Sequence, residues 1–304
     1  KVYIQKGNIE GAKKLLEERY DQPLYIESQL ILSYVYSLTD LEKALEVALD
    51  IEPGEEWREK YVVWKEVLDR LTDDELFNSI KLSKVYIDEG YPYLAIALLE
   101  PKNESMSEYV DGIYMLGKAY YENKQYQKSI DLLESNMFLS DLNQYIYWIL
   151  ARDYYMLDDI DTSFSYYDTA ISYGGDNADE DLYKEYFDLL IQDDLTEKAL
   201  EVTDRAEGIF DGDWISLQYM NLYSLREDTQ RFEYYMENIE YEDLDSTLKG
   251  EYLTTKIDYL IQNSLFDDAK RSLDLFWDLD QYDPRYNFLY AKLSFEDRKS
   301  TRLN

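Results

Sequence analysis

Residues 113–136 read IYMLGKAYYENKQYQKSIDLLESN, and this stretch decides the fold. Its first half repeats at helical spacing through Leu116, Gly117 and Tyr120. A polar break follows at residues 122–125, and a second helical pattern runs from Tyr126 to Leu133. The stretch therefore predicts two helices that are joined by a tight turn.

The same arrangement returns 34 residues away on both sides, without a gap in the count. In the first helix the aligned sets are Leu82, Leu116 and Leu150; Ser83, Gly117 and Ala151; and Tyr86, Tyr120 and Tyr154. In the second helix they are Ala95, Ser129 and Ser163, followed by Leu99, Leu133 and Tyr167. A period of 34 residues with a small residue in each helix is typical of stacked helical repeats.

On these residues the chain resembles the tetratricopeptide repeat (TPR) family. The resemblance implies an all-α fold, an α-solenoid in which antiparallel helix pairs stack into a right-handed superhelix. It also implies that the first helix of each pair lines a concave surface that binds a protein or peptide. Because stacking buries the apolar face of each pair, the small residues are expected at close helix contacts and the tyrosines between helices.

The rest of the chain continues the pattern with less regularity. We expect a single TPR-like solenoid over residues 1–296, with about eight repeats of which the outermost are partial. The regular repeats span about 76–104, 110–138 and 144–174. Further pairs are predicted at 24–38 with 40–51, 181–192 with 196–207, 214–225 with 230–239, and 250–262 with 266–279. A helix near 55–71 does not fit the alternation of first and second helices. It is either unpaired or part of a non-standard pair.

The two ends of the sequence suggest a fragment of a longer protein. The last predicted helix opens at Pro284 and ends near Glu296. The following residues 297–304, DRKSTRLN, resemble the translation of a sequencing adapter. We interpret them as a tail that is not native to the protein, the alternative being a basic, frayed C-terminus.

Composition narrows the function further. The formal net charge of −34 disfavours nucleic acid and anionic membrane surfaces as partners. The chain has no histidine and no cysteine, which removes the commonest general base, the commonest metal ligand and all thiol chemistry. We therefore expect no catalytic site, no metal and no cofactor. The lack of cysteine fits a reducing cytoplasm, and no apolar run is long enough to span a membrane.

The candidate binding residues follow the small position of the first helix. Lys84, Lys118 and Arg152 occupy one equivalent position in the three regular repeats. Aromatic residues accompany them at neighbouring positions: Tyr114, Tyr121, Trp148 and Tyr155. A row of cations with aromatic walls suits a peptide that bears carboxylates. The alternative is that these cations are solvated partners of nearby Asp and Glu side chains.

The C-terminal half differs in charge. Its equivalent positions are Glu185, Asp188, Tyr219 and Asp258, so the binding surface is expected to change sign along its length, unless these acids reflect composition alone. The acidic segments 176–181 and 211–213 lack the spacing of a calcium loop. Chaperone-binding TPR domains clamp a terminal carboxylate with lysines and asparagines, and the asparagines are missing here.

The sequence thus favours a non-enzymatic protein- or peptide-binding scaffold. Two alternatives stay open: a sensor or regulatory domain of a larger truncated protein, and an enzyme that carries this array as an appendage. The identity of the partner and the oligomeric state are not encoded in any motif.

Overall fold

The computed structural model describes residues 2–18, 26–106, 109–137 and 143–303. Within these ranges all regular structure is helical, as the 34-residue period predicts. The chain forms two compact units, Lys1–Ala178 (unit 1) and Asp179–Asn304 (unit 2), and each is described by itself. The expected single array over residues 1–296 therefore stays a prediction.

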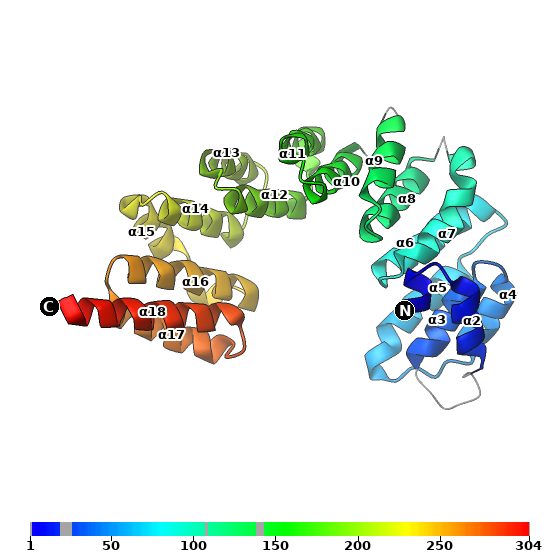
Figure 1. The fold of residues 1–304 in the computed structure, drawn as a ribbon, viewed down its shortest axis with the longest axis horizontal. Helices are drawn as coiled ribbons and strands as arrows, with labels where there is room; N and C mark the ends of the chain where they lie inside the picture. The colour runs from blue at the N-terminus through cyan, green and yellow to red at the C-terminus, as the bar shows by residue number, and fades with distance from the viewer. Residues whose placement is uncertain (1, 19–25, 107–108, 138–142, 304) are drawn as a thin grey trace. The chain divides into compact units, whose positions relative to one another are not determined.

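Unit 1 is built from helix pairs whose members pack against each other along the chain (Figure 1). Its α-helices are α1 (Val2–Gln5), α2 (Ile9–Glu17), α3 (Ile26–Tyr36), α4 (Leu41–Leu49), α5 (Arg58–Asp69), α6 (Glu75–Asp88), α7 (Pro92–Leu99), α8 (Val110–Glu122), α9 (Tyr126–Ser135), α10 (Asn143–Met156) and α11 (Ile160–Gly174). The first helices α6, α8 and α10 contact one another in turn, so they share one side of this unit.

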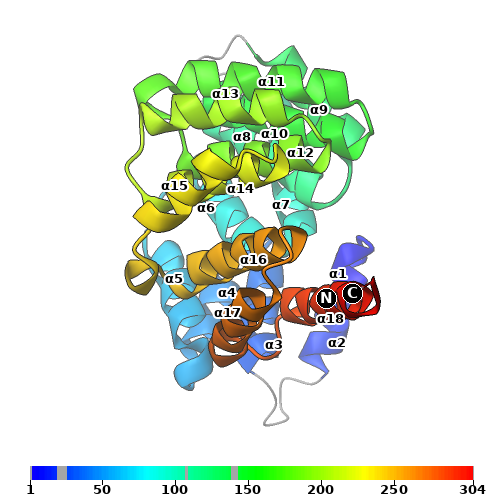
Figure 2. The ribbon, with the colours of Figure 1, turned by 90° about the vertical axis from the view of Figure 1, so that its left-hand side faces the viewer.

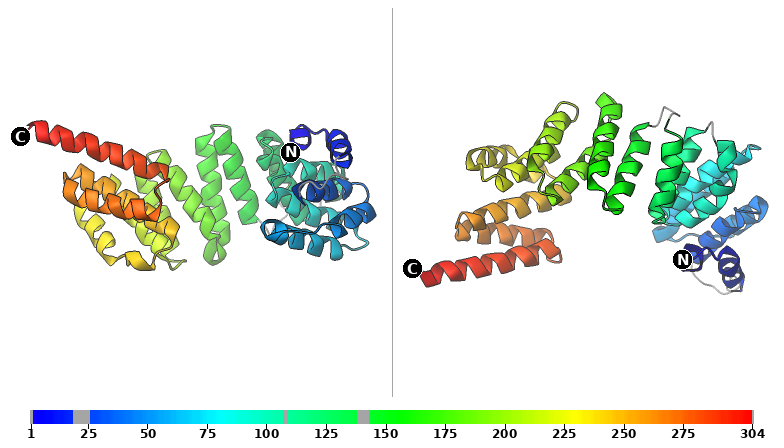
Figure 3. Two further views of the ribbon diagram at one scale, coloured as in Figure 1. Left: turned by 90° about the horizontal axis from the view of Figure 1, so that it is seen from below. Right: turned by 45° about the horizontal axis from the view of Figure 1, so that its top comes forward.

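Unit 2 continues the same construction. Its α-helices are α12 (Glu180–Gln192), α13 (Thr196–Glu207), α14 (Asp213–Leu225), α15 (Thr229–Asn238), α16 (Ser246–Gln262), α17 (Phe266–Leu279) and α18 (Pro284–Leu303). Figure 2 shows α14 beside α16, and α16 also packs against α18 (Figure 3, left). The predicted end of the last helix near Glu296 is wrong, because α18 continues to Leu303.

The period is visible in the backbone of the turns. Gly90, Lys124 and Asp158 have positive φ values of 77°, 60° and 66°, and they follow one another at 34 residues. In each turn the next N–H donates to the carbonyl five residues earlier, which caps the end of the first helix. Each first helix therefore stops at the same point of its repeat, and the chain reverses into the second.

The small residues hold the helices of a pair close together. A Cβ atom added to Gly117 would lie 2.5 Å from Cδ2 of Leu133, so α8 and α9 approach too closely for a side chain. The hydroxyl of Ser129 donates to the carbonyl of Gly117 at 3.1 Å, and Ser163 donates to Ala151 at 2.8 Å. These contacts confirm the architectural role that the aligned small positions predict.

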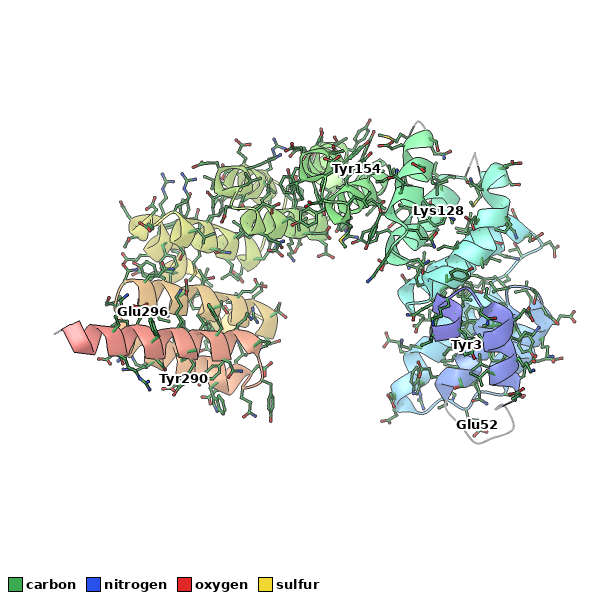
Figure 4. The ribbon with its side chains drawn as sticks, in the orientation of Figure 1. Tyr3, Glu52, Lys128, Tyr154, Tyr290 and Glu296 are labelled. Carbon is green, nitrogen blue, oxygen red and sulfur yellow. The ribbon has the colours of Figure 1, made fainter. Side chains whose placement is uncertain are left out.

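The aligned tyrosines join successive pairs. Tyr120 donates its hydroxyl proton to Glu100 at 2.7 Å. Tyr154, which is labelled in Figure 4, donates to Glu134 at the same distance. The two glutamates are themselves 34 residues apart. Each ring is packed between helices while its hydroxyl binds a carboxylate of the preceding pair, which explains why tyrosine recurs at this position.

The irregular helix α5 is attached through one aromatic residue. Trp64 is fully buried, and its indole N–H donates to the hydroxyl of Ser33 at 2.9 Å. Its ring meets Tyr34 of α3 edge to face, with centroids 4.6 Å apart. This helix therefore packs as a single element between α4 and α6, which the sequence pattern left unresolved.

Candidate functional site

One face of α8 carries three of the predicted site residues. Tyr114, Lys118 and Tyr121 are spaced by four and three residues, which places them on one side of a helix. All three side chains are partly exposed. The intervening residues Leu116, Gly117 and Tyr120 are buried. One side of α8 is therefore packed against other helices, and the other side is open.

A matching face runs along α10. Trp148, Arg152 and Tyr155 are partly exposed there, and Tyr145 precedes them one turn earlier. The ring of Tyr145 lies 6.0 Å from that of Tyr114 and 6.5 Å from that of Trp148. Tyr145 thus links the two helices, and the sequence prediction missed it because its equivalent in the preceding repeat is Asp111.

Arg152 connects the same two helices through its guanidinium group. The guanidinium carbon lies 4.2 Å from the ring centroid of Trp148 on its own helix and 5.9 Å from that of Tyr121 on α8. Such cation–π contacts hold the planar group in one orientation. We call the set formed by Tyr114, Lys118, Tyr121, Tyr145, Trp148 and Arg152 the aromatic–cationic stripe.

Lys118 contributes a second positive charge to the stripe. It is partly buried, and no carboxylate of the residues that the structure describes lies within ion-pair distance of its ammonium group. Five other lysines of unit 1 do form ion pairs; Lys128, for example, contacts Glu100 at 2.9 Å. The ammonium of Lys118 is therefore available to an anionic partner.

Two predicted site residues lie beside the stripe and not in it. Lys84 on α6 is 64% exposed and pairs with Asp88 of its own helix at 2.6 Å. The positions of α6 that correspond to Tyr114 and Tyr121 are Ile80 and Ile87, so Lys84 lacks the aromatic walls. Tyr155 packs on Phe164 of α11, with ring centroids 6.4 Å apart.

A buried acid lies next to Arg152 in the chain. The side chain of Asp153 is fully buried in unit 1, and neither carboxylate oxygen has a hydrogen-bond partner among the described residues. Burial raises the pKa of this carboxyl to about 8, and the nearby hydroxyl of Ser129 acts in the opposite direction. Asp153 therefore keeps its proton to a much higher pH than an exposed aspartate does.

The predicted C-terminal positions separate into different roles. Asp188 lines a cleft of unit 2. Asp258 instead pairs with Lys292 of α18 and accepts from the amide of Gln262 at 2.7 Å. Glu185 is partly buried on α12.

The expected surface position of Tyr219 is wrong. Its side chain is only 3% exposed, and its hydroxyl donates to Asp204 at 2.8 Å. Its ring stacks on Tyr235 of α15 with centroids 4.9 Å apart. The neighbouring residue Gln218 lines the cleft instead. The alignment misplaces this position because the pairs of unit 2 depart from the 34-residue count.

Two negative findings apply to the described residues. Among them no group of three or more acidic side chains is arranged to hold a metal ion. No described helix combines the length and the apolar character that a membrane span requires.

Comparison with known proteins yields only distant structural likeness. No family model and no curated protein matches the sequence. A solved structure of pilF from Pseudomonas aeruginosa aligns with a TM-score of 0.46 and 15% identity, over 80% of this chain and 97% of that one. The P58(IPK) TPR domain aligns with a TM-score of 0.32 and 13% identity, over 98% and 87% of the two chains. Both scores are low, so the description of the fold rests on the helix pairs themselves.

Proposed function

We propose that this chain is a non-enzymatic helical-repeat scaffold that binds an acidic segment of a partner protein along the aromatic–cationic stripe. The observation that carries the proposal is the position of the Arg152 guanidinium against Trp148 and Tyr121, together with Lys118 on the same helix as Tyr121, for which no described acid forms an ion pair. These groups come from two helices that lie next to each other in unit 1.

The chemistry of the stripe suits carboxylates and aromatic or apolar neighbours. A guanidinium binds a carboxylate through two parallel hydrogen bonds, and the ring on which it stacks fixes its direction. Lys118 supplies a point charge one helix away for a second acidic group. The partly exposed rings of Tyr114, Tyr145 and Trp148 offer apolar area between the charges at a low cost in side-chain entropy.

We infer that the ligand is negatively charged because the stripe is basic whereas the rest of the protein is acidic. The chain carries 65 acidic and 31 basic residues, so a surface with two cations and no described acid in contact with Lys118 is unusual for it. Nucleic acid also carries negative charge, but the net charge of −34 opposes the approach of a long polyanion. A short acidic peptide segment is the ligand that this balance favours.

The proposal can be tested by calorimetry with defined peptides. The probe is an acetylated, amidated hexapeptide that carries two glutamates and one leucine, and its glutamine analogue is the ligand control. We expect the variant Lys118→Gln/Arg152→Gln to bind the acidic peptide about tenfold or more weakly, because a hydrogen bond to a charged group contributes about 1.5–3 kcal/mol.

A matched variant removes the same charges elsewhere in unit 1. Lys65→Gln/Arg70→Gln acts on Lys65 of α5 and on Arg70, which directly follows this helix, and the two side chains pair with Asp69 and Glu66 of α5. This control should bind the acidic peptide as the unmodified protein does. Equal binding of the glutamine peptide, or an equal loss in both double variants, would show that the stripe does not recognise carboxylates.

A further inference from the structure

Unit 2 contains a cleft of about 700 Å³ that no part of the proposed function uses. It is lined by the first helices α12, α14 and α16 and by Arg285 at the start of α18. Figure 2 shows α14 and α16 side by side at this position. Phe187, Leu217 and Leu248 supply apolar walls. A hollow of this size accommodates a side chain together with part of the main chain that carries it.

The positive charges of the cleft are already paired. Lys184 contacts Glu180 at 2.5 Å, and Arg285 contacts Asp283 at 2.6 Å. Lys184 also lies 5.1 Å from the ring centroid of Trp214, which fixes it against the wall. Both cations also act on Glu251 through their charge, but neither forms an ion pair with it in the described part of the chain.

Asp188 and Glu251 are two of the four acids of the lining that form no ion pair with these cations, and of the other two Asp245 caps the start of α16. Asp188 lines the cleft from α12 and Glu251 from α16, and neither has an ion-pair or hydrogen-bond partner in the described part of the chain. Burial raises the pKa of Asp188, and the charge of Glu185 adds to the effect. Burial likewise raises the pKa of Glu251, with the charge of Asp188 as the next cause. Both side chains keep exposed surface, and Arg285 and Lys184 oppose the effect of Asp188 on Glu251. A ligand cation beside both carboxylates would favour their charged forms.

An independent feature of the same wall also lacks a partner. Trp214 is 6% exposed, and its indole N–H has no acceptor among the residues that the structure describes. The indole nitrogen faces Gly212, which lines the cleft as well, at 3.3 Å from the point where a Cβ atom would stand. A buried donor without an acceptor is unfavourable, so this N–H marks a place for a ligand oxygen.

We infer that the cleft between α12, α14 and α16 binds a lysine or arginine side chain of an extended peptide. The cationic group lies between Asp188 and Glu251, and its aliphatic stem packs on Phe187 and Leu248. A carbonyl oxygen of the bound peptide accepts the indole N–H of Trp214. This inference stands apart from the proposed function, because it concerns the other unit and a ligand of opposite charge.

A peptide cation fits these groups better than a metal ion. No described cluster of three acidic side chains exists to hold a metal, whereas two carboxylates suffice for an ammonium or guanidinium. The indole N–H, a donor, would repel a metal ion and would match a peptide carbonyl. The apolar walls also match the methylene stem of a long basic side chain.

The test records the indole N–H resonances of the full chain during titration with a defined peptide. The protein has five tryptophans, and the variant Trp214→Phe identifies the resonance of interest. The probe is an acetylated, amidated pentapeptide, Gly-Leu-Arg-Leu-Gly. The same peptide with citrulline in place of arginine keeps the shape and removes the charge.

We expect the arginine peptide to shift the Trp214 resonance and to bind at least about tenfold more tightly than the citrulline peptide. Asp188→Asn/Glu251→Gln should abolish this preference, and each single variant should reduce it. The control Glu201→Gln/Asp278→Asn removes two exposed acids from the second helices α13 and α17, and it should retain the preference. Far-UV circular dichroism confirms that each variant is folded.

Three results with these peptides and variants would overturn the inference, and a fourth comes from the control variant. They are equal binding of the two peptides, unchanged binding by the Asp188→Asn/Glu251→Gln variant, and a Trp214 resonance that does not move at saturation. An equal loss in the control variant would also overturn it, because the attraction would then come from net charge alone.

Discussion

The buried carboxyl of Asp153 predicts how the stability of unit 1 depends on pH. In the folded protein burial raises its pKa from 3.8 to about 8. In the unfolded chain the group ionises near its ordinary value. Between these values the unfolded state has released a proton that the folded state still binds, so the free energy of unfolding falls as the pH rises.

The size of the effect follows from the two pKa values. One titrating group changes the free energy of unfolding by at most about 1.4 kcal/mol per pH unit. From about pH 5.5 to about pH 7.5 the contribution of Asp153 therefore falls by roughly 2.5 kcal/mol, and it levels off above about pH 8. The contribution is fully present only below the ordinary pKa of the carboxyl.

The variant Asp153→Asn isolates this contribution, because the amide has nearly the same shape and does not titrate. We expect the stability of the variant, relative to the unmodified protein, to rise by roughly 2.5 kcal/mol across the same pH range. Urea unfolding followed by far-UV circular dichroism at several pH values measures the difference. The control Asp131→Asn changes an exposed carboxylate on the neighbouring helix α9 and should show no such trend. A difference for Asp153→Asn that is constant with pH would refute the reasoning.

Three further substitutions test the packing of unit 1, with the same unfolding assay as the readout. Gly117→Leu should destabilise the protein by about 1–3 kcal/mol, because α8 and α9 leave no room for a side chain; wild-type stability would contradict the close contact at Leu133. Tyr154→Phe should cost about 0.5–1.5 kcal/mol through the lost hydrogen bond to Glu134; unchanged stability would contradict a contribution of this bond. Trp64→Ala should cost about 3–5 kcal/mol, since this fully buried ring attaches α5; a small effect would mean that α5 is held by other contacts.

The helix pairs could be predicted because each repeat needs the same residue types at the same positions. A small residue is needed wherever two helices of a pair approach closely, and Gly117 and Ala151 satisfy that demand at the same point of successive repeats. The predicted bounds 196–207 and 266–279 are those of α13 and α17. The turn conformations were not predicted, because Lys124 and Asp158 are not the glycines that usually mark positive φ.

The candidate site could be predicted only where the repeats preserve residue type. Lys118 and Arg152 align, and so they were found, whereas Tyr145 aligns with an aspartate and was missed. The sequence misplaces Tyr219 because the turns of unit 2 do not recur every 34 residues. Their positive-φ residues are Asp194, Glu227 and Ser264. A repeat period predicts which side of its helix a residue occupies only where successive repeats have the same length.

The cleft of unit 2 is invisible in the sequence for a different reason. Asp188 and Glu251 come from helices that are far apart in the chain, and many other acids surround them in the sequence. What distinguishes these two is that the folded chain brings both into the lining of one cleft, while Asp258 pairs with Lys292. Pairing depends on side-chain positions in space, which no spacing rule supplies.

The most direct test of the account compares an acidic and a basic peptide on the same protein. We propose that two surfaces built from first helices recognise opposite charges. Each contains one tryptophan, Trp148 in the stripe and Trp214 in the cleft. In the spectrum of the indole N–H groups, the glutamate hexapeptide should shift Trp148 and leave Trp214 unchanged, and the arginine pentapeptide should do the reverse. If both peptides shift the same resonance, or if neither shifts these two, the account is contradicted.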